Sequence, residues 1–154
     1  MTVDELVQHL SAERFVSDFS AASKEEALEK LTEAVVAGSN MSDHATILQM
    51  LRNREQLGST ALSQGVAFPH GRSLAVTKLT LLVARSKAGV DFESEDGKST
   101  HLFFVILAPP QDTGNYYLQA LGKIAELVRK SEVCNGLMEA EDFDALATVL
   151  KEAG

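Results

Sequence analysis

The chain has 154 residues, which is long enough for one well-packed core. Its composition, 45% hydrophobic and 23% charged residues, excludes a disordered or low-complexity protein. Its net charge of −8 makes nucleic acid and anionic membranes unfavourable partners. The single cysteine, Cys134, excludes an intramolecular disulfide and favours a reducing, cytoplasmic setting. No apolar stretch approaches the roughly 18 residues of a membrane helix, and we expect residues 1–154 to form a single domain.

The first half of the sequence predicts three helices and one short strand. Ser23 begins a capping box with Glu26 at its third position, and Gly38 is expected to end that helix. Ser42 is expected to cap the next helix. In chain order, the predicted elements are a helix over 3–10, a strand over 15–19, a helix over 24–38 and a helix over 42–57.

The second half predicts strands followed by helices. The segment 58–72 is too polar and too rich in glycine for a helix, so we expect a loop in which residues 66–68 are extended. Asp96-Gly97 is a hairpin signal between two apolar runs. The predicted elements are strands over 79–85 and 101–108 and helices over 117–130, 131–140 and 142–151. The order predicts an α/β fold: a single mixed β-sheet flanked by helices on its faces.

His70 differs from the other histidines in its surroundings. It lies in G-V-A-F-P-H-G-R, where rigid Pro69 and flexible Gly71 should present the imidazole in a defined direction. Three arginines and one acid occur between positions 52 and 72, although the whole chain is acidic. A neutral imidazole is a competent nucleophile at neutral pH, and fixed donors and cations stabilise a phosphoryl group in transfer.

These features predict that His70 handles an anion or becomes phosphorylated. The alternative from the residues alone is a histidine in an ordinary Gly/Pro turn among solvated arginines. His9, His44 and His101 are interpreted as surface or structural histidines, and no two histidines have metal-ligand spacing, so we expect no metal and no cofactor. The hydroxyl donors and cations expected around His70 are Ser59, Thr60, Ser63, Arg54 and Arg72.

Two sequence blocks together resemble a known family. R-E-Q-L-G-S-T (54–60), followed by G-V-A-F-P-H-G-R (65–72), resembles the active-site block of enzyme IIA of the bacterial phosphotransferase system, in its fructose/mannitol class. The likeness continues through G-V-D-F-E-S-E-D-G-K (89–98) and L-A-P-P (107–110), and the first block is similar to the nitrogen-regulatory, PtsN-like subtype. The resemblance implies the mannitol-type enzyme IIA fold, with residues 1–154 as one type 2 domain.

The resemblance also implies a reaction. A phosphohistidine carrier protein, HPr or a nitrogen-branch relative, donates its phosphoryl group to His70. Arg54 matches the family's active-site arginine and Thr60 its hydroxyl neighbour. In sugar-transporting members the group passes on to an enzyme IIB domain, whereas in the regulatory subtype the phosphorylation state controls partner proteins linked to nitrogen and potassium physiology. We expect the regulatory role, with the sugar-specific role as the alternative.

One position departs from the family pattern. The family usually has a second histidine in the helix after the L-A-P strand, and Tyr117 stands in that place. Tyrosine keeps a hydroxyl donor but is neutral at pH 7. The phosphoryl group on His70 should therefore be less stable, or its transfer to the next protein slower. A binding-only regulator, one that binds its partners without efficient transfer, is a further alternative. We expect Tyr117, Phe68 and Arg72 to contact either the residues that bind the phosphoryl group or a partner protein.

Overall fold

A computed structural model describes residues 1–154 and shows the predicted α/β class. None of its helices combines the length and the apolar character that crossing a bilayer requires. The elements, in chain order, are α1 (Val3–Gln8), a 3₁₀ helix η1 (Ala12–Arg14), β1 (Phe15–Val16), α2 (Lys24–Ala37), α3 (His44–Gln56), β2 (Val66–Ala67), β3 (His70–Arg72), β4 (Thr80–Val90), β5 (Thr100–Ala108), α4 (Tyr116–Leu127), α5 (Ser131–Glu139) and α6 (Phe143–Ala153).

The sheet is built around the antiparallel pair β4 and β5, which confirms the predicted hairpin. Its order is β1-β4-β5-β2, and β3 also pairs with β5. β2 and β3 run parallel to β5 and occupy two successive parts of its edge, opposite residues 102–103 and 106–108. Between them the Pro69 carbonyl accepts the Ile106 N–H at 3.0 Å. His70 is therefore the first residue of a short edge strand.

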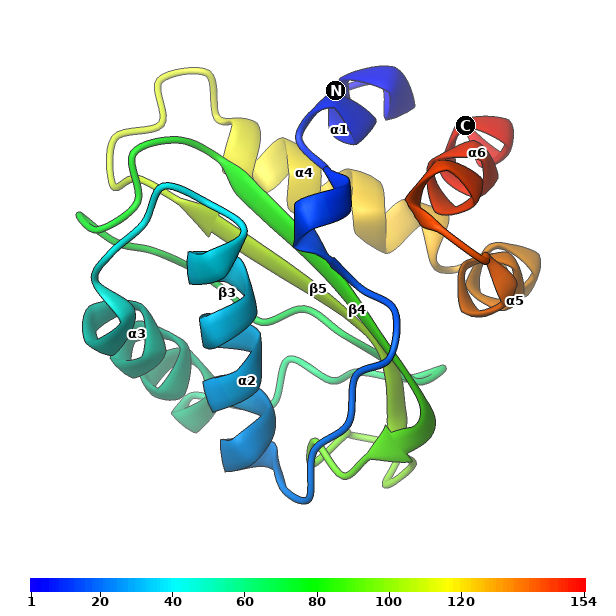
Figure 1. Ribbon diagram of the computed structural model, residues 1–154, viewed down its shortest axis with the longest axis horizontal. Helices are drawn as coiled ribbons and strands as arrows, with labels where there is room; N and C mark the ends of the chain where they lie inside the picture. Colours follow the sequence, from blue (N-terminus) through cyan, green and yellow to red (C-terminus); the bar gives the residue numbers. More distant parts are fainter.

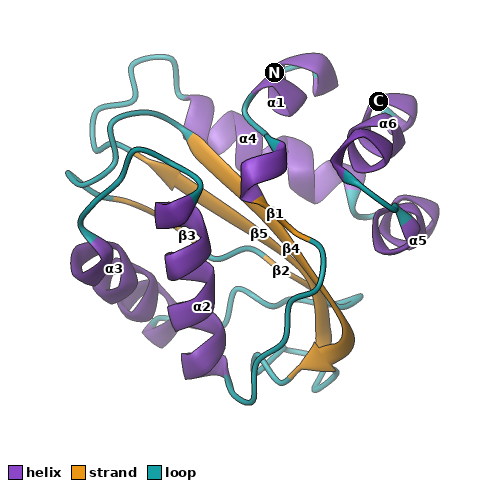
Figure 2. Cartoon of the chain, viewed as in Figure 1, coloured by secondary structure: helices purple, strands orange, loops and turns teal.

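Helices cover both faces of the sheet (Figure 1, Figure 2). α2 and α3 pack on one face, and α1, α4, α5 and α6 pack on the other. Side chains of β5 alternate between the two cores, so both sides of this strand are buried. This double burial explains why β5 has a continuous apolar sequence. Its residues face the α4 side at Leu102, Phe104 and Ile106 and the α3 side at Phe103, Val105 and Leu107.

The register of β3 decides what surrounds His70. His70 pairs with Ile106, which points to the α4 face, so the His70 side chain and that of Arg72 emerge on this face. A side chain at Gly71 would lie on the opposite face, toward α3. A Cβ atom at Gly71 would lie 1.9 Å from Sδ of Met50. Glycine at this position therefore allows α3 to approach the edge strand closely.

Some local predictions are wrong. Asp43, not Ser42, caps α3, because its carboxylate accepts the Thr46 N–H at 3.1 Å. Residues 70–72 form a strand and not a loop, because the edge of β5 offers them backbone partners. The strand predicted over 15–19 is limited to the two residues of β1, and β4 is longer than predicted.

Candidate functional site

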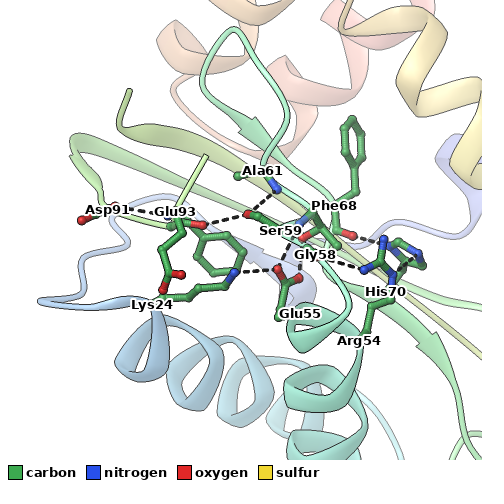
Figure 3. Close-up of polar contacts among 12 residues, drawn as sticks. Lys24, Arg54, Glu55, Gly58, Ser59, Ala61, Phe68, His70, Asp91 and Glu93 are labelled. Atoms are coloured by element: carbon green, nitrogen blue, oxygen red, sulfur yellow. Dashed lines mark hydrogen bonds and ion pairs between the residues drawn. The ribbon is translucent and has the colours of Figure 1, made fainter. Parts of the chain in front are cut away.

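The two ring nitrogens of His70 face partners of opposite kind (Figure 3). Nδ1 lies 2.5 Å from the Phe68 carbonyl oxygen, and Nε2 lies 3.3 Å from Nε of Arg54. A carbonyl can only accept a hydrogen bond and a guanidinium can only donate one. Nδ1 therefore carries the proton, and Nε2 presents its lone pair. The contacts select the tautomer whose nucleophilic nitrogen is Nε2.

Burial lowers the pKa of His70 below its ordinary value, because desolvation disfavours the charged ring. The hydrogen bond to the Phe68 carbonyl acts in the opposite direction. The Arg54 guanidinium lowers the pKa further, and the Glu55 carboxylate raises it. Since the net shift is downward, the ring is neutral at pH 7 and its lone pair is available for attack.

Two guanidinium groups near His70 have no carboxylate partner. Arg54 also donates to the Gly58 carbonyl at 2.9 Å. The guanidinium carbon of Arg72 lies over the Tyr117 ring, 4.7 Å from its centroid. Neither arginine takes part in an ion pair of the structure. Two uncompensated guanidinium groups around a nucleophilic imidazole suit a bound phosphoryl group.

Tyr117 lies beside His70 at the first turn of α4. The two ring centroids are 6.0 Å apart and the ring planes are tilted by 49°. Asp112 accepts the Tyr117 N–H at 2.7 Å, which holds the start of the helix. Burial raises the pKa of the Tyr117 phenol above its ordinary value, so the hydroxyl is neutral at pH 7. Its contact with a phosphoryl group stays a prediction.

Two residues expected at the site use other atoms than we predicted. The Thr60 hydroxyl donates to the Glu55 carboxylate at 2.5 Å, so its proton is not free for a phosphoryl oxygen. The Phe68 ring is buried and stacks with Phe104 at 6.2 Å between centroids, so this ring offers no surface to a partner protein. Phe68 reaches His70 through its backbone carbonyl alone.

Glu55 lies near the site but is not among the residues that we predicted there. Its carboxylate is buried and lies 3.0 Å from Nζ of Lys24. A signal was present in the sequence, because position 55 follows Leu51 by four residues and so continues the apolar stripe of α3. An acidic residue in such a stripe indicates a buried polar contact.

The chain is similar to known proteins over most of its length. Residues 8–153 match the family described as "Phosphoenolpyruvate-dependent sugar phosphotransferase system, EIIA 2". A nitrogen regulatory protein of Bradyrhizobium diazoefficiens is 37% identical over 128 residues, which cover 83% of this chain and 82% of that protein. The fructose-specific EIIABC component of Bacillus subtilis is 31% identical over 129 residues, but the chain spans only 20% of its length.

A solved structure of the nitrogen regulatory protein IIA-Ntr from Neisseria meningitidis has a TM-score of 0.86 at 32% identity, with 95% of this chain and 99% of that chain covered. The mannitol IIA of Escherichia coli has a TM-score of 0.76 at 26% identity, and the match covers 92% of this chain and 98% of that chain. These likenesses confirm the expected enzyme IIA fold. Since the family match extends over nearly the whole sequence, the chain belongs to the EIIA 2 family of the phosphoenolpyruvate-dependent sugar phosphotransferase system.

Proposed function

We propose that this chain is a phosphoryl-carrier protein in which Nε2 of His70 accepts a phosphoryl group from a phosphohistidine carrier, HPr or a nitrogen-branch relative. The observation that carries the proposal is the pair of opposed contacts on the imidazole. These contacts keep Nε2 unprotonated and place Arg54 at that same nitrogen. Membership in a phosphotransfer family supports the same class of reaction.

In the proposed step the Nε2 lone pair attacks phosphorus while the P–N bond to the carrier's imidazole breaks, and the electron pair of that bond returns to the carrier. No proton leaves His70, because Nδ1 keeps its hydrogen. The Phe68 carbonyl stabilises the positive charge that develops on the ring. Arg54 moves from Nε2 to a phosphoryl oxygen, and Arg72 supplies a second cation on the Tyr117 side.

Exposed apolar side chains next to the site residues form the proposed docking surface for the carrier. Each belongs to a segment that supplies a site residue: the end of α3, the loop after β3, or the start of α4. A contiguous exposed apolar patch marks an interaction surface, and we propose that these side chains form one. The carrier should therefore bind through apolar contacts more than through charge steering. The side chains and their exposed fractions are Leu57 85%, Leu74 91%, Tyr116 50% and Leu118 52%.

The main role we propose is regulatory and cytoplasmic: the phosphorylation state of His70 controls partner proteins linked to nitrogen and potassium physiology. The similarity to a nitrogen regulatory protein over most of both chains supports this role. The similarity to a fructose-specific EIIABC component favours a second candidate, a sugar-specific enzyme IIA that passes phosphate to an enzyme IIB. Tyr117 in place of a second histidine argues against efficient onward transfer and leaves a binding-only regulator as the third candidate.

The test is incubation of the purified chain with phosphotransferase carrier proteins and phosphoenolpyruvate, followed by intact mass. We expect the gain of one phosphoryl group, labile in acid and stable in alkali. His70→Ala should abolish the gain, whereas His9→Ala and His44→Ala should keep it. A His70→Ala protein that still gains the phosphoryl mass would contradict the proposal.

A second incubation separates the candidate roles. Enzyme IIB domains of the fructose and mannitol type are added to the phosphorylated chain. Slow loss of the phosphoryl group agrees with the regulatory role, whereas rapid transfer to one of these domains indicates the sugar-specific role. A wild-type chain that no carrier phosphorylates indicates a binding-only regulator.

A further inference from the structure

The carboxylate of Glu55 is buried at the end of α3, where its exposed side-chain fraction is 5%. It accepts the Thr60 N–H at 3.0 Å and the Thr60 hydroxyl at 2.5 Å. It also lies 3.0 Å from Nζ of Lys24 on α2 (Figure 3). Both of its oxygens are therefore occupied, and two of the three contacts lead into the loop that follows α3. The Lys24 ammonium compensates the buried charge.

A continuous series of hydrogen bonds leads from this carboxylate to the imidazole. The Thr60 residue that Glu55 holds accepts the Phe68 N–H on its backbone carbonyl at 3.1 Å. The Phe68 carbonyl in turn contacts Nδ1 of His70 at 2.5 Å. The carbonyl that fixes the His70 tautomer therefore belongs to a peptide segment whose position depends on Thr60, and Thr60 is held on its amide and its hydroxyl by Glu55.

A second branch leads from the same loop to Arg54. The Gly58 carbonyl accepts a hydrogen bond from Nη1 of Arg54 at 2.9 Å, and the Gly58 N–H donates to the Glu55 carbonyl at 3.1 Å. Because Thr60 is only two residues further on, the Glu55 side chain fixes the far end of the short loop that orients the arginine. The pairing of Glu55 with Lys24 also keeps this carboxylate away from Arg54, which stays free for an anion.

We infer that Glu55 is a positioning residue for phosphoryl transfer: through Thr60 it holds the Phe68 carbonyl that keeps the proton of His70 on Nδ1 and the loop that aims Arg54 at Nε2. The inference rests on the proposed function of His70 as phosphoryl acceptor. Glu55 makes no hydrogen bond to the imidazole, so it positions the ring only through these neighbours, while its charge raises the pKa of His70. A purely structural role would leave the tautomer of His70 unchanged, and this difference makes the inference testable.

The central variant is Glu55→Gln, which keeps the size of the side chain. The amide can still accept the Thr60 N–H on its oxygen, but it loses the ion pair with Lys24 and one acceptor for the Thr60 hydroxyl. The matched control is Glu25→Gln, because Glu25 pairs with Arg52 on the protein surface and makes no hydrogen bond or ion pair with the loop.

Two measurements are made on each variant. Nitrogen-15 NMR of the unphosphorylated protein reports which ring nitrogen of His70 carries the proton. The rate of phosphorylation by the carrier is measured separately. We expect Glu55→Gln to convert the single tautomer into a mixture and to slow phosphorylation by roughly tenfold, equal to about 1.4 kcal/mol in the barrier. Glu25→Gln should match wild type in both measurements.

Thr60 variants give an independent check. Thr60→Val replaces the hydroxyl with a methyl group and should shift the His70 tautomer in the same direction as Glu55→Gln. Thr60→Ser keeps the hydroxyl and should retain the wild-type tautomer. If Glu55→Gln fails to fold, Thr60→Val decides the outcome. A folded Glu55→Gln protein with wild-type tautomer and rate overturns the inference, even if its melting temperature falls. The tautomer measurement needs no carrier, so it remains decisive if the proposed phosphorylation itself fails.

Discussion

Arg54→Ala should slow the phosphorylation of His70 without unfolding the protein. In the structure Nε of Arg54 lies 3.3 Å from the nitrogen that we propose as the acceptor, so this cation already lies where a phosphoryl group would bind. A charge-assisted hydrogen bond is worth roughly 1.5–3 kcal/mol. At about 1.4 kcal/mol per decade, its loss should slow transfer by on the order of 10- to 100-fold.

The stability cost should be small. The contact that Arg54 makes with the loop is a single hydrogen bond to the Gly58 carbonyl, in a region open to solvent. The net value of such a bond is about 0.5–1.5 kcal/mol, and solvent exposure favours the lower end. The variant should therefore remain folded, with a slightly lower melting temperature.

The same variant should change the pH dependence. The Arg54 guanidinium lowers the pKa of His70, so its removal should raise that pKa toward the ordinary value. More of the imidazole is then protonated under mildly acidic conditions. The rate deficit of Arg54→Ala relative to wild type should consequently deepen as the pH falls from about 8 to about 6.

The assay is single-turnover phosphorylation by the phosphorylated carrier, with calorimetric melting of the same samples. Arg52→Ala is the matched control, because Arg52 lies on the same helix but pairs with Glu25 on the surface. Arg54→Lys keeps the charge without the planar fork and should give an intermediate rate. An unchanged rate in Arg54→Ala, an equal loss in Arg52→Ala, or a collapsed melting curve would refute the reasoning.

Three further predictions concern the site and its surface. Tyr117→His should lengthen the lifetime of phospho-His70, because an imidazolium donates a charge-assisted hydrogen bond to the phosphoryl group. The lost packing of the tyrosine ring should lower the unfolding free energy by roughly 1–3 kcal/mol. Lower stability with an unchanged lifetime would show that this position does not contact the phosphoryl group. Carrier association should depend weakly on salt and should slow in Leu74→Ser; a tenfold loss of rate between low and physiological salt would contradict apolar docking. Because the pKa of folded His70 is lowered, the folded protein binds this proton less readily than the unfolded protein. The contribution of His70 to the unfolding free energy should be constant above about pH 6.5 and decrease below it, and the phosphorylation rate should fall as the pH passes through the lower pKa of the folded state; an NMR titration midpoint above about 6.5 would contradict the sign.

Much of the fold follows from local patterns in the sequence. The apolar run of β5 predicts a strand buried on both faces, and the structure places helices on each side of it. Ser23 accepts the Glu26 N–H at 3.1 Å, as its cap pattern predicts, but the Glu26 carboxylate accepts the Ala22 N–H and not that of Ser23, so only half of the capping box forms. The setting of His70 between Pro69 and Gly71 also predicts a reactive residue, because the rigidity of one neighbour and the flexibility of the other are local properties.

The roles of Thr60, Phe68 and Glu55 could not be predicted in the same way. The partner of the Thr60 hydroxyl depends on where α3 ends relative to the loop, and the second partner of Glu55 comes from α2. The Phe68 ring is buried because β2 and β3 keep one register along β5, which places position 68 on the α4 face beside Phe104. Such contacts arise from tertiary packing, which local sequence patterns do not encode.

The most direct test of the central claim is nitrogen-15 and phosphorus-31 NMR of the chain after phosphorylation by the carrier, with its histidines labelled. The structure predicts one phosphoramidate, with the phosphoryl group on Nε2 of His70 and the proton still on Nδ1 toward the Phe68 carbonyl. A phosphoryl group on Nδ1, on another side chain, or on no residue at all would contradict the account.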